Sequence, residues 1–301
     1  MRGPGPGHSV ALMTDARSRM LAGLDVAERR LELAGAPTNL LEAGTGDPLV
    51  LLHGGIECGG AYWAPVVARL SERHRLVIPD LPGLGESDPF VALDHGSFGR
   101  WITQLVEATC ERKPLLLAHS LLGSLAAREC AREASRWAGL VIYAAPGVAR
   151  YRMPLGLRLT AVRFSLRPTK KNNERFERWA LLDLDATRAR DPDWHAAFEQ
   201  YSLERARLTH VKRTMRTLVE LGTRRVPPEE LAAARLPVSM IWGRHDRMTP
   251  LGLADDARTR FGWPLHVLEG VGHAPHVERP DEFAATLEEA VRVRPPVPAR
   301  A

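Results

Sequence analysis

The sequence predicts an α/β protein with a mostly parallel central sheet flanked by helices. Short, continuous apolar runs recur along the 301 residues and alternate with amphipathic helical patterns. Strands buried on both faces read as continuous apolar runs, and regular strand–helix alternation is typical of parallel sheets. The alternation stops between residues 147 and 235, where helical spacing alone occurs, so we expect a helical cap inserted before the last two strands.

The elements can be assigned in chain order. The expected strands are ERRLELAG, TNLLEAG, PLVLLHGG, HRLVIPDL, PLLLAHS, GLVIYAAP, LPVSMIWG and PLHVLEG. The expected helices between them are AYWAPVVARLSERH, SFGRWITQLVEATCER, LLGSLAARECARE, LGLADDARTRF and PDEFAATLEEAVRV. The expected cap helices are ERFERWALLDL, WHAAFEQYSLERA and LTHVKRTMRTLVELG. The strand segments have the length of typical strands, and in the helical segments the apolar residues have the spacing of amphipathic helices.

These patterns divide the chain into a core, a cap and two ends. We expect the core at residues 25–146 and 236–293, with the cap at 147–235 between its two parts. Residues 1–24 are rich in Gly, Pro and Arg, and residues 294–301 are rich in Pro. Both are predicted to be flexible, because neither has an apolar pattern that could pack. Met13 is an alternative start of the chain.

Composition excludes several classes of protein. No run approaches the ~20 apolar residues of a transmembrane helix, and the N-terminal residues have no apolar signal-peptide segment, so we expect a cytoplasmic protein. The three cysteines, Cys58, Cys110 and Cys130, have no C-x-x-C spacing. They indicate neither a disulfide framework nor a zinc site.

The charge is uneven but does not indicate nucleic acid binding. The net charge is +5 with a pI near 9.4, and the basic residues are scattered among acids without an aromatic-basic or recognition-helix pattern. The surplus comes from Gly147 to Glu230, which contain eighteen Lys and Arg against eleven Asp and Glu. We therefore expect no nucleic acid partner and a basic cap.

Ser120 lies where a buried strand passes into a helix. A nucleophile elbow has its serine on such a turn, in the pattern G-x-S-x-G, because larger side chains two residues away would collide. Ala118 is small, whereas Leu122 departs from the pattern and Gly123 follows it. The pattern predicts a nucleophile on a slightly shifted turn with Gly123 in the crowded position. The alternative is a serine that caps a helix.

An acid and a base follow in the order that a serine nucleophile requires. Asp246 follows the strand LPVSMIWG, and His273 follows the strand PLHVLEG. Both loops leave the same edge of the predicted sheet, so their side chains can meet over Ser120. The spacing therefore predicts catalytic Ser120, Asp246 and His273.

Three other histidines compete for the role of the base. His245 would point away from its neighbouring aspartate on an extended segment, and His276 lies nearer the following helix. His119 precedes the predicted nucleophile and points away from it. We interpret all three as structural.

The stretch LVLLHGGIECGG predicts an oxyanion hole. Acyl transfer needs backbone N–H groups directed at the oxygen that becomes negative, and a glycine turn after a strand allows close approach. We assign the N–H groups of Gly55 and Leu121 to this role. The alternative is that HGG forms a tight turn and nothing more.

Together these motifs resemble the α/β-hydrolase superfamily, in its capped esterase and C–C hydrolase branch. The matching landmarks, from about Ala27 to Arg292, are HGG (53–55), DLPGLGESD (80–88), AHSLLG (118–123), WGRHD (242–246) and GHAPHVERPDEF (272–283). By resemblance, residues 80–88 form a structural loop beside the site and carry no catalytic role. Glu278 and Pro280 resemble the positions that fix the histidine loop to the last helix.

The resemblance implies a serine hydrolase that cleaves a carboxylic ester or similar acyl compound of a small-molecule substrate, with no metal or organic cofactor. Haloalkane dehalogenases and epoxide hydrolases of this fold use an aspartate where Ser120 stands. Meta-cleavage-product C–C hydrolases remain an alternative, although they commonly have Trp where this chain has Ala274. Cofactor-free haloperoxidase-like enzymes also share the three residues. A non-catalytic binding protein of this fold, for which Leu122 is the sole support, is the remaining alternative.

The start of the cap combines apolar and basic residues. Residues 147–171 contain seven Lys and Arg and no acid, and Leu155, Leu159, Val162 and Leu166 recur at helical spacing. This pattern fits a solvated lid helix. It also fits an entrance for substrates with an apolar part and an anionic group, or a face attracted to an anionic lipid surface.

Overall fold

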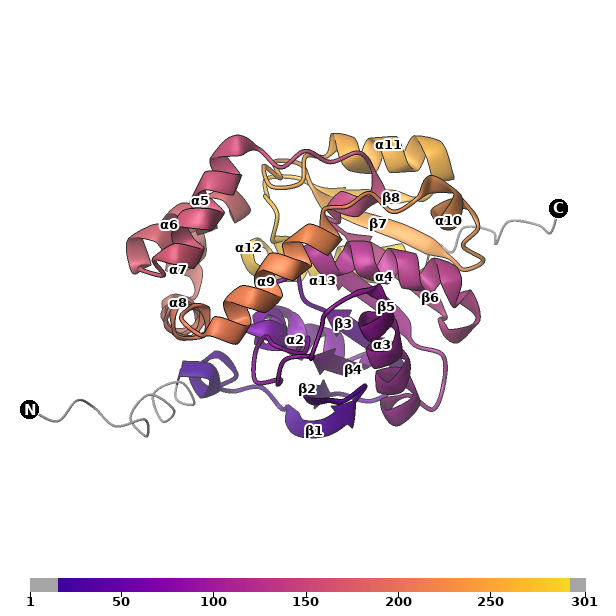
Figure 1. The fold of residues 1–301 in the computed structure, drawn as a ribbon, viewed down its shortest axis with the longest axis horizontal. Helices are drawn as coiled ribbons and strands as arrows, with labels where there is room; N and C mark the ends of the chain where they lie inside the picture. Colours follow the sequence, from indigo (N-terminus) through magenta and orange to yellow (C-terminus); the bar gives the residue numbers. More distant parts are fainter. Residues whose placement is uncertain (1–15, 293–301) are drawn as a thin grey trace, which may run out of the picture.

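The computed structural model describes residues 16–292 of the chain, and its centre is an eight-stranded sheet of order β1-β2-β4-β3-β5-β6-β7-β8 (Figure 1). The strands are β1 (Ala27–Leu33), β2 (Ala36–Ala43), β3 (Asp47–Leu52), β4 (His74–Pro79), β5 (Leu115–His119), β6 (Gly139–Tyr143), β7 (Val238–Gly243) and β8 (Leu265–Leu268). β2 is antiparallel to both of its neighbours, and the other neighbouring pairs are parallel. The predicted fold class is confirmed.

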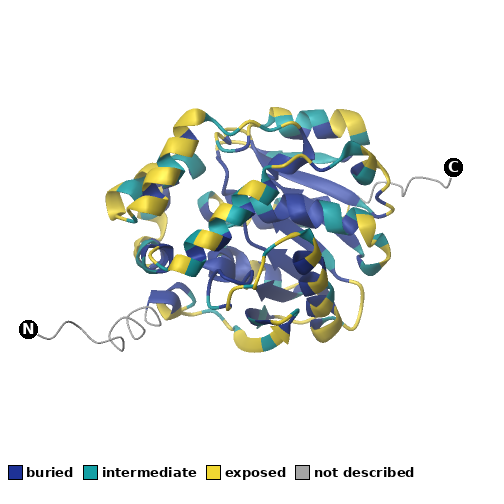
Figure 2. Cartoon of the chain, in the orientation of Figure 1, coloured by how far each residue is buried: buried dark blue, intermediate teal, exposed yellow. Residues whose placement is uncertain are grey.

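Burial explains why the strand sequences are apolar throughout. Every residue of β6 and β7 is buried, whereas the first four residues of the edge strand β1 are exposed. Figure 2 shows the buried strands between helices whose outer faces are exposed. A sheet covered on both faces needs apolar side chains at successive positions, and an edge strand does not.

Helices cover the sheet on both sides. They are α2 (Ala64–Ser71), α3 (His95–Thr109), α4 (Ser120–Arg132), α10 (Pro228–Ala232), α11 (Gly252–Phe261), α12 (Pro275–Glu278) and α13 (Pro280–Arg292). Short 3-10 helices are η1 (Gly59–Trp63), η2 (Ala134–Arg136) and η3 (Pro146–Val148). α2 packs with α12 and α13, while α4 packs with α3 and α10. Since β3 to β8 are parallel, the loops after their carboxyl ends meet at one edge of the sheet.

Besides η3 and α10, five helices lie between β6 and β7. They are α5 (Leu155–Leu166), α6 (Lys170–Ala180), α7 (Leu184–Arg190), α8 (Pro192–Ala206) and α9 (Thr209–Gly222). α9 packs against α4 of the core, and α8 packs against α6, α7 and α9. Figure 1 shows α5, α6, α7 and α8 together on the side away from the sheet, with α9 running from them toward α4. The helical insertion thus contacts the core through α9, next to the helix that begins at Ser120, and through α8, whose Phe198 packs with Tyr62 of η1.

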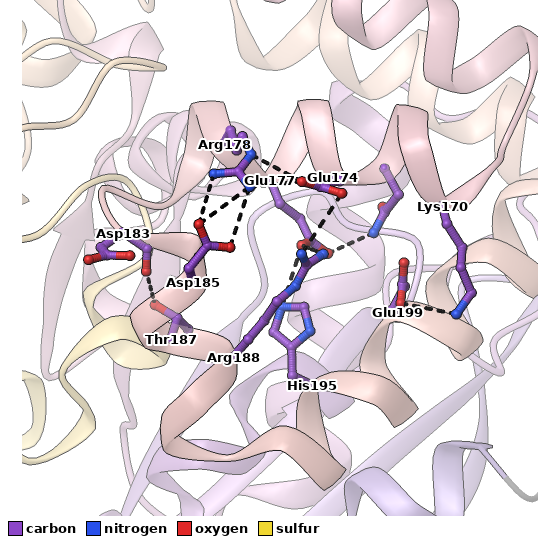
Figure 3. Close-up of polar contacts among 11 residues, drawn as sticks. Lys170, Glu174, Glu177, Arg178, Asp183, Asp185, Thr187, Arg188, His195 and Glu199 are labelled. Atoms are coloured by element: carbon purple, nitrogen blue, oxygen red, sulfur yellow. Dashed lines mark hydrogen bonds and ion pairs between the residues drawn. The ribbon is translucent and has the colours of Figure 1, made fainter.

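A buried carboxylate joins three of the inserted helices (Figure 3). Glu177 of α6 is 5% exposed and accepts a hydrogen bond from Asn173 Nδ2 at 2.7 Å. Its Oε2 also lies 3.4 Å from Arg188 Nη2 of α7 and 3.4 Å from His195 Nε2 of α8. A buried charge is tolerated when it is paired and hydrogen-bonded. Glu177 therefore fixes the positions of α6, α7 and α8 relative to one another.

The chain before β1 differs from the expected flexible extension where the structure describes it. Residues 16–20 are helical, and Ala16 and Met20 are 0% and 2% exposed. Both belong to a second hydrophobic cluster that includes Tyr62 of η1 and Phe198 of α8. Residues 16–24 therefore pack against both core and inserted helices, which no local pattern in the sequence indicates.

Two predictions concern residues that the structure does not describe. Residues 1–15, with Met13, and residues 293–301 lie outside the described range. The whole predicted C-terminal tail, residues 294–301, is therefore not described.

Between residues 16 and 292, no helix is both long and apolar enough to cross a membrane.

Candidate active site

Ser120 lies on the turn between β5 and α4 in a strained backbone conformation. Its φ is +51°, one of three positive values among the non-glycine residues of the described chain. A serine in this region costs energy and persists when the surrounding packing holds it. The turn projects the side chain from the carboxyl edge of the sheet, as the nucleophile elbow predicts.

The crowded position next to this turn is Gly123. A Cβ atom there would lie 2.8 Å from both Ala118 O and Ala145 Cβ. Leu122, in contrast, is fully buried and belongs to the main hydrophobic core. The Leu122 side chain therefore points into the core, where a glycine would leave a cavity. The prediction that Gly123 marks the tight contact is confirmed.

This difference predicts separate effects of two substitutions. Gly123→Ala adds a Cβ where no space exists, so we expect a loss of about 1–3 kcal/mol in stability together with a lower kcat, because the turn that carries Ser120 must move. Leu122→Ala removes buried methyl groups, so we expect a loss of about 2–5 kcal/mol with kcat retained per folded molecule. Urea unfolding and kcat normalised to folded protein separate the two. An unchanged kcat in Gly123→Ala would contradict the assignment.

The structure brings the three predicted polar residues into one hydrogen-bonded chain. His273 Nε2 lies 3.0 Å from Ser120 Oγ, and His273 Nδ1 lies 2.8 Å from Asp246 Oδ2. Asp246 follows β7, and His273 follows β8. All three residues are 5–6% exposed. Such a chain can carry the proton of the hydroxyl to the imidazole while the carboxylate holds the ring.

Backbone and side-chain donors fix the Asp246 carboxylate. Its Oδ1 accepts hydrogen bonds from Met248 N and Thr249 N, each at 2.8 Å, and its Oδ2 accepts one from Thr249 Oγ1 at 2.6 Å. These local bonds are typical of an aspartate that closes a turn. Sequence reasoning missed Thr249, although an Asp followed three residues later by Thr is a signal for this turn.

A second group of side chains holds the backbone of His273. Its carbonyl oxygen accepts hydrogen bonds from His119 Nε2 at 3.1 Å and from Tyr143 Oη at 3.2 Å. Tyr143 Oη also lies 3.1 Å from His276 Nδ1. A carbonyl can accept but cannot donate, so the proton of His119 is on Nε2. His119 and His276 are therefore structural, as predicted, but they fix the position of the candidate base.

Burial keeps these supporting histidines neutral. It lowers the pKa of both His119 and His276 well below the ordinary value, and the neighbouring His273 lowers both further. His53 of the glycine turn is fully buried, and its Nε2 accepts a hydrogen bond from Leu81 N at 3.1 Å. Burial lowers the pKa of His53 to about 3. Each ring thus packs as an uncharged polar group.

The loop that carries His273 is also tied to the inserted helices. His273 N donates to Ala180 O at 2.7 Å, and the Glu278 carboxylate accepts from Gly272 N at 2.7 Å and from Leu182 N at 2.6 Å. Burial raises the pKa of Glu278, and these N–H donors oppose that shift. Glu278 therefore joins the histidine loop to the segment after α6, whereas the resemblance indicated a link to the last helix.

Gly55 and Leu121 lie next to each other beside Ser120. Gly55 has φ +79°, and a Cβ there would lie 3.1 Å from Leu121 Cδ1 and 2.9 Å from Leu218 Cδ2 of α9. Gly222, at the end of α9, also packs closely, since a Cβ there would lie 2.8 Å from Leu121 O. The predicted oxyanion residues are therefore neighbours, and α9 of the insertion covers them.

The loop of residues 80–88 supports the turn after β3. The buried Asp80 carboxylate accepts from Gly60 N at 2.5 Å and from Glu86 N at 2.8 Å. Burial raises the pKa of Asp80, and these donors together with Arg17 oppose that shift. Asp80 thus binds backbone N–H groups and holds the loop in place. This agrees with the structural role that the resemblance implies for residues 80–88.

Glu57 lies two residues beyond Gly55 and faces the inserted helices. It lines a small cavity together with Tyr62, Glu177, His195 and Ser202, among others. Burial raises the pKa of Glu57 to about 7, so its charge changes near neutral pH. Sequence reasoning assigned no role to this carboxyl. Within residues 16–292, no group of three or more His, Cys, Asp and Glu side chains is placed to hold a metal ion.

Comparisons with known proteins agree with this fold. The pimeloyl-(acyl-carrier protein) methyl ester esterase of Aeromonas hydrophila is 27% identical over 259 residues, which cover 82% of this chain and 96% of the esterase. The 2-hydroxy-6-oxo-6-(2'-aminophenyl)hexa-2,4-dienoic acid hydrolase of Metapseudomonas resinovorans is 24% identical over 279 residues, or 86% of this chain and 89% of that enzyme.

Solved structures and a family model extend the comparison. A carboxylesterase of Bacillus subtilis superposes with a TM-score of 0.79 at 18% identity, covering 94% of this chain and 98% of its own, which shows a shared fold. The model of the alpha/beta hydrolase family matches residues 49–286. This match spans most of the sequence and includes Ser120, Asp246 and His273. The chain therefore belongs to the alpha/beta hydrolase family.

Proposed function

We propose that this hydrolase cleaves carboxylic esters or similar acyl compounds with Ser120 as nucleophile. The observation that carries the proposal is the hydrogen-bonded chain from Ser120 Oγ through His273 to Asp246, at 3.0 and 2.8 Å. Serine with an oriented imidazole is the arrangement that acyl transfer requires. The methyl ester esterases among the relatives support an ester as the substrate.

The reaction proceeds in two halves. His273 Nε2 takes the proton of Ser120 as Oγ attacks the carbonyl carbon, and then gives this proton to the departing alcohol. The acyl group remains on Ser120 as an ester. Water then attacks this ester while His273 again takes the proton, and the acid leaves with Ser120 restored. Asp246 stabilises the imidazolium that forms in each half.

The N–H groups of Gly55 and Leu121 bind the oxygen that becomes negative. Two features support this role: the close approach of the two residues, and the start of α4 directly at Ser120. Donors at a helix N-terminus favour negative charge, and fixed backbone donors need no rearrangement during the reaction. Gly55 has φ +79°, so a substitution there would strain the turn and displace the donor.

Carbon–carbon bond hydrolysis by the same residues is the second candidate. The dienoic acid hydrolase of Metapseudomonas resinovorans favours it, since 86% of this chain aligns with that enzyme. Ala274, which follows the candidate base, is fully buried in the second hydrophobic cluster. A tryptophan cannot occupy that position without repacking, which separates this chain from the C–C hydrolases that carry one.

A panel of substrates distinguishes ester hydrolysis from carbon–carbon bond hydrolysis. Purified protein is given p-nitrophenyl esters of increasing acyl length, together with a ring-cleavage dienone, and Ser120→Ala serves as the blank. We expect saturable ester turnover that disappears in the blank, with little dienone cleavage. Faster dienone cleavage would favour the second candidate. Turnover of neither compound class would favour the non-catalytic alternative.

A further inference from the structure

Helix α5 exposes an apolar stripe to solvent. Its members are Leu155, Leu159, Val162 and Leu166, which are 69%, 58%, 50% and 74% exposed. The other large hydrophobic side chains exposed in residues 16–292 are Val91 and Leu182. Single exposed apolar residues are ordinary, but four in one row on one helix indicate an interaction surface.

The stripe faces directly away from the protein. At about 100° per residue its four members fall within roughly 60° of one another around the helix axis. Leu157 and Phe164 lie on the opposite side and are buried, and the ring of Phe164 stacks on Phe176 of α6 at 6.0 Å. The inner face thus anchors α5, and the stripe is not part of the packing. Figure 2 shows the exposed outer faces of this helical group.

Arginines border the stripe on both sides. Arg158 and Arg163 are exposed, and each lies about 70° from its centre, in opposite directions. Arg150, Arg152, Arg167 and Lys171 add positive charge at its two ends, whereas Lys170 pairs with Glu199 of α8 at 3.6 Å. Residues 147–171 contain no acid. The structure records no ion pair of Arg158 or Arg163 with another described residue. The exposed face of α5 is therefore both apolar and positively charged, so its binding partner must combine apolar groups with negative charge.

We propose that α5 docks the protein on the surface of an anionic lipid bilayer. The stripe would enter the boundary between headgroups and acyl chains, while the flanking arginines contact lipid phosphates. A bilayer surface complements both features of this face, because its acyl chains can contact the apolar stripe and its negatively charged headgroups can contact the arginines. The stripe is a ridge on a convex helix rather than a groove, so it fits a soft, flat surface. Because the stripe points outward, it does not line a pocket for substrate.

The proposal predicts binding that depends on both apolar and charged residues. Protein is sedimented with vesicles of phosphatidylcholine alone or mixed equally with phosphatidylglycerol, from low to high salt. Wild-type protein is expected to bind the mixed vesicles, with binding that weakens as salt rises. Leu159→Ser/Leu166→Ser should lower the partition coefficient by about tenfold or more at every salt concentration. Arg158→Gln/Arg163→Gln should lower it several-fold at low salt and flatten the salt dependence.

Matched variants separate docking from general effects. Arg100→Gln/Arg132→Gln removes the same charge from exposed positions on α3 and α4 and should bind like wild type. Val91→Ser removes a fully exposed apolar side chain elsewhere and should also have no effect. Circular dichroism and thermal melting confirm that each variant is folded.

Three results would overturn the proposal. The first is equal sedimentation of wild-type protein and Leu159→Ser/Leu166→Ser with mixed vesicles. The second is dissociation of an oligomer by the same double substitution without any vesicle binding, which would make α5 an interface between copies of this chain. The third is salt-sensitive binding of a purified acidic protein with no binding to vesicles, which would assign the surface to a protein partner.

Discussion

Ser120→Ala is expected to lower kcat for ester hydrolysis by about 10⁴-fold or more with folding intact. The hydroxyl is the atom that forms the acyl intermediate, and no neighbouring side chain can replace it. His273→Ala should produce a loss of similar size, since it removes the base that lies 3.0 Å from Ser120 Oγ. Asp246→Asn should lose a similar or somewhat smaller factor, because an amide at this position favours the wrong imidazole tautomer.

A serine in the same helix provides the matched control. Ser124 is buried one turn after Ser120, and its Oγ accepts a hydrogen bond from Gly147 N at 2.8 Å. Ser124→Ala removes an equivalent hydroxyl, so it should reduce stability by about 1 kcal/mol and leave kcat within a few-fold of wild type. Kinetics with p-nitrophenyl acetate and urea unfolding measure both quantities. Near wild-type turnover by Ser120→Ala would end the assignment of the nucleophile.

The sheet and the meeting of three polar residues could be predicted from the sequence, for a physical reason. Strands buried on both faces must be apolar along their whole length, so the runs that form β5, β6 and β7 can be read directly. In a parallel sheet the residue after each strand lies at one edge, so Ser120, Asp246 and His273 could be expected to meet. Both inferences depend on local patterns and one rule of topology.

The supporting contacts could not be predicted because they join distant segments. His119 and Tyr143 bond to the carbonyl of His273, 154 and 130 residues further along the chain. Leu122 shows a related limit: the sequence places it next to the turn but does not give the direction of its side chain. The packing of residues 16–24 and the outward face of α5 are also set by three-dimensional contacts that the sequence pattern leaves open.

Acid is expected to destabilise the protein through buried neutral histidines, and His53 provides the clearest case. Its native pKa is about 3, whereas the ordinary value is 6.5. The native state therefore binds fewer protons than the unfolded state between these values, so stability is complete above pH 6.5 and falls as pH decreases toward 3. The loss from His53 alone is about 1.4 kcal/mol per pH unit. His119 and His276 act in the same direction.

Fully and partly buried carboxyls oppose this effect over part of the range. Burial raises the pKa of Glu57 from 4.5 to about 7, so its native form binds more protons than the unfolded chain between these values. Its contribution to stability therefore rises as pH falls from about 7 to 4.5 and is constant below that. Asp80 and Glu278 shift in the same direction as Glu57. The total stability should thus change less above pH 4.5 than the histidines alone would require.

A comparison with a non-titrating variant isolates the histidine from these carboxyls. His53→Gln keeps an acceptor for Leu81 N but cannot take up a proton in acid. Relative to this variant, wild-type protein should lose about 2 kcal/mol in the free energy of unfolding between pH 6.5 and pH 4.5, measured by urea unfolding. His245→Gln, at an exposed position, controls for the loss of a histidine. Because the carboxyls are the same in all three proteins, a difference between wild type and His53→Gln that stays constant with pH would mean that His53 accepts its proton without unfolding.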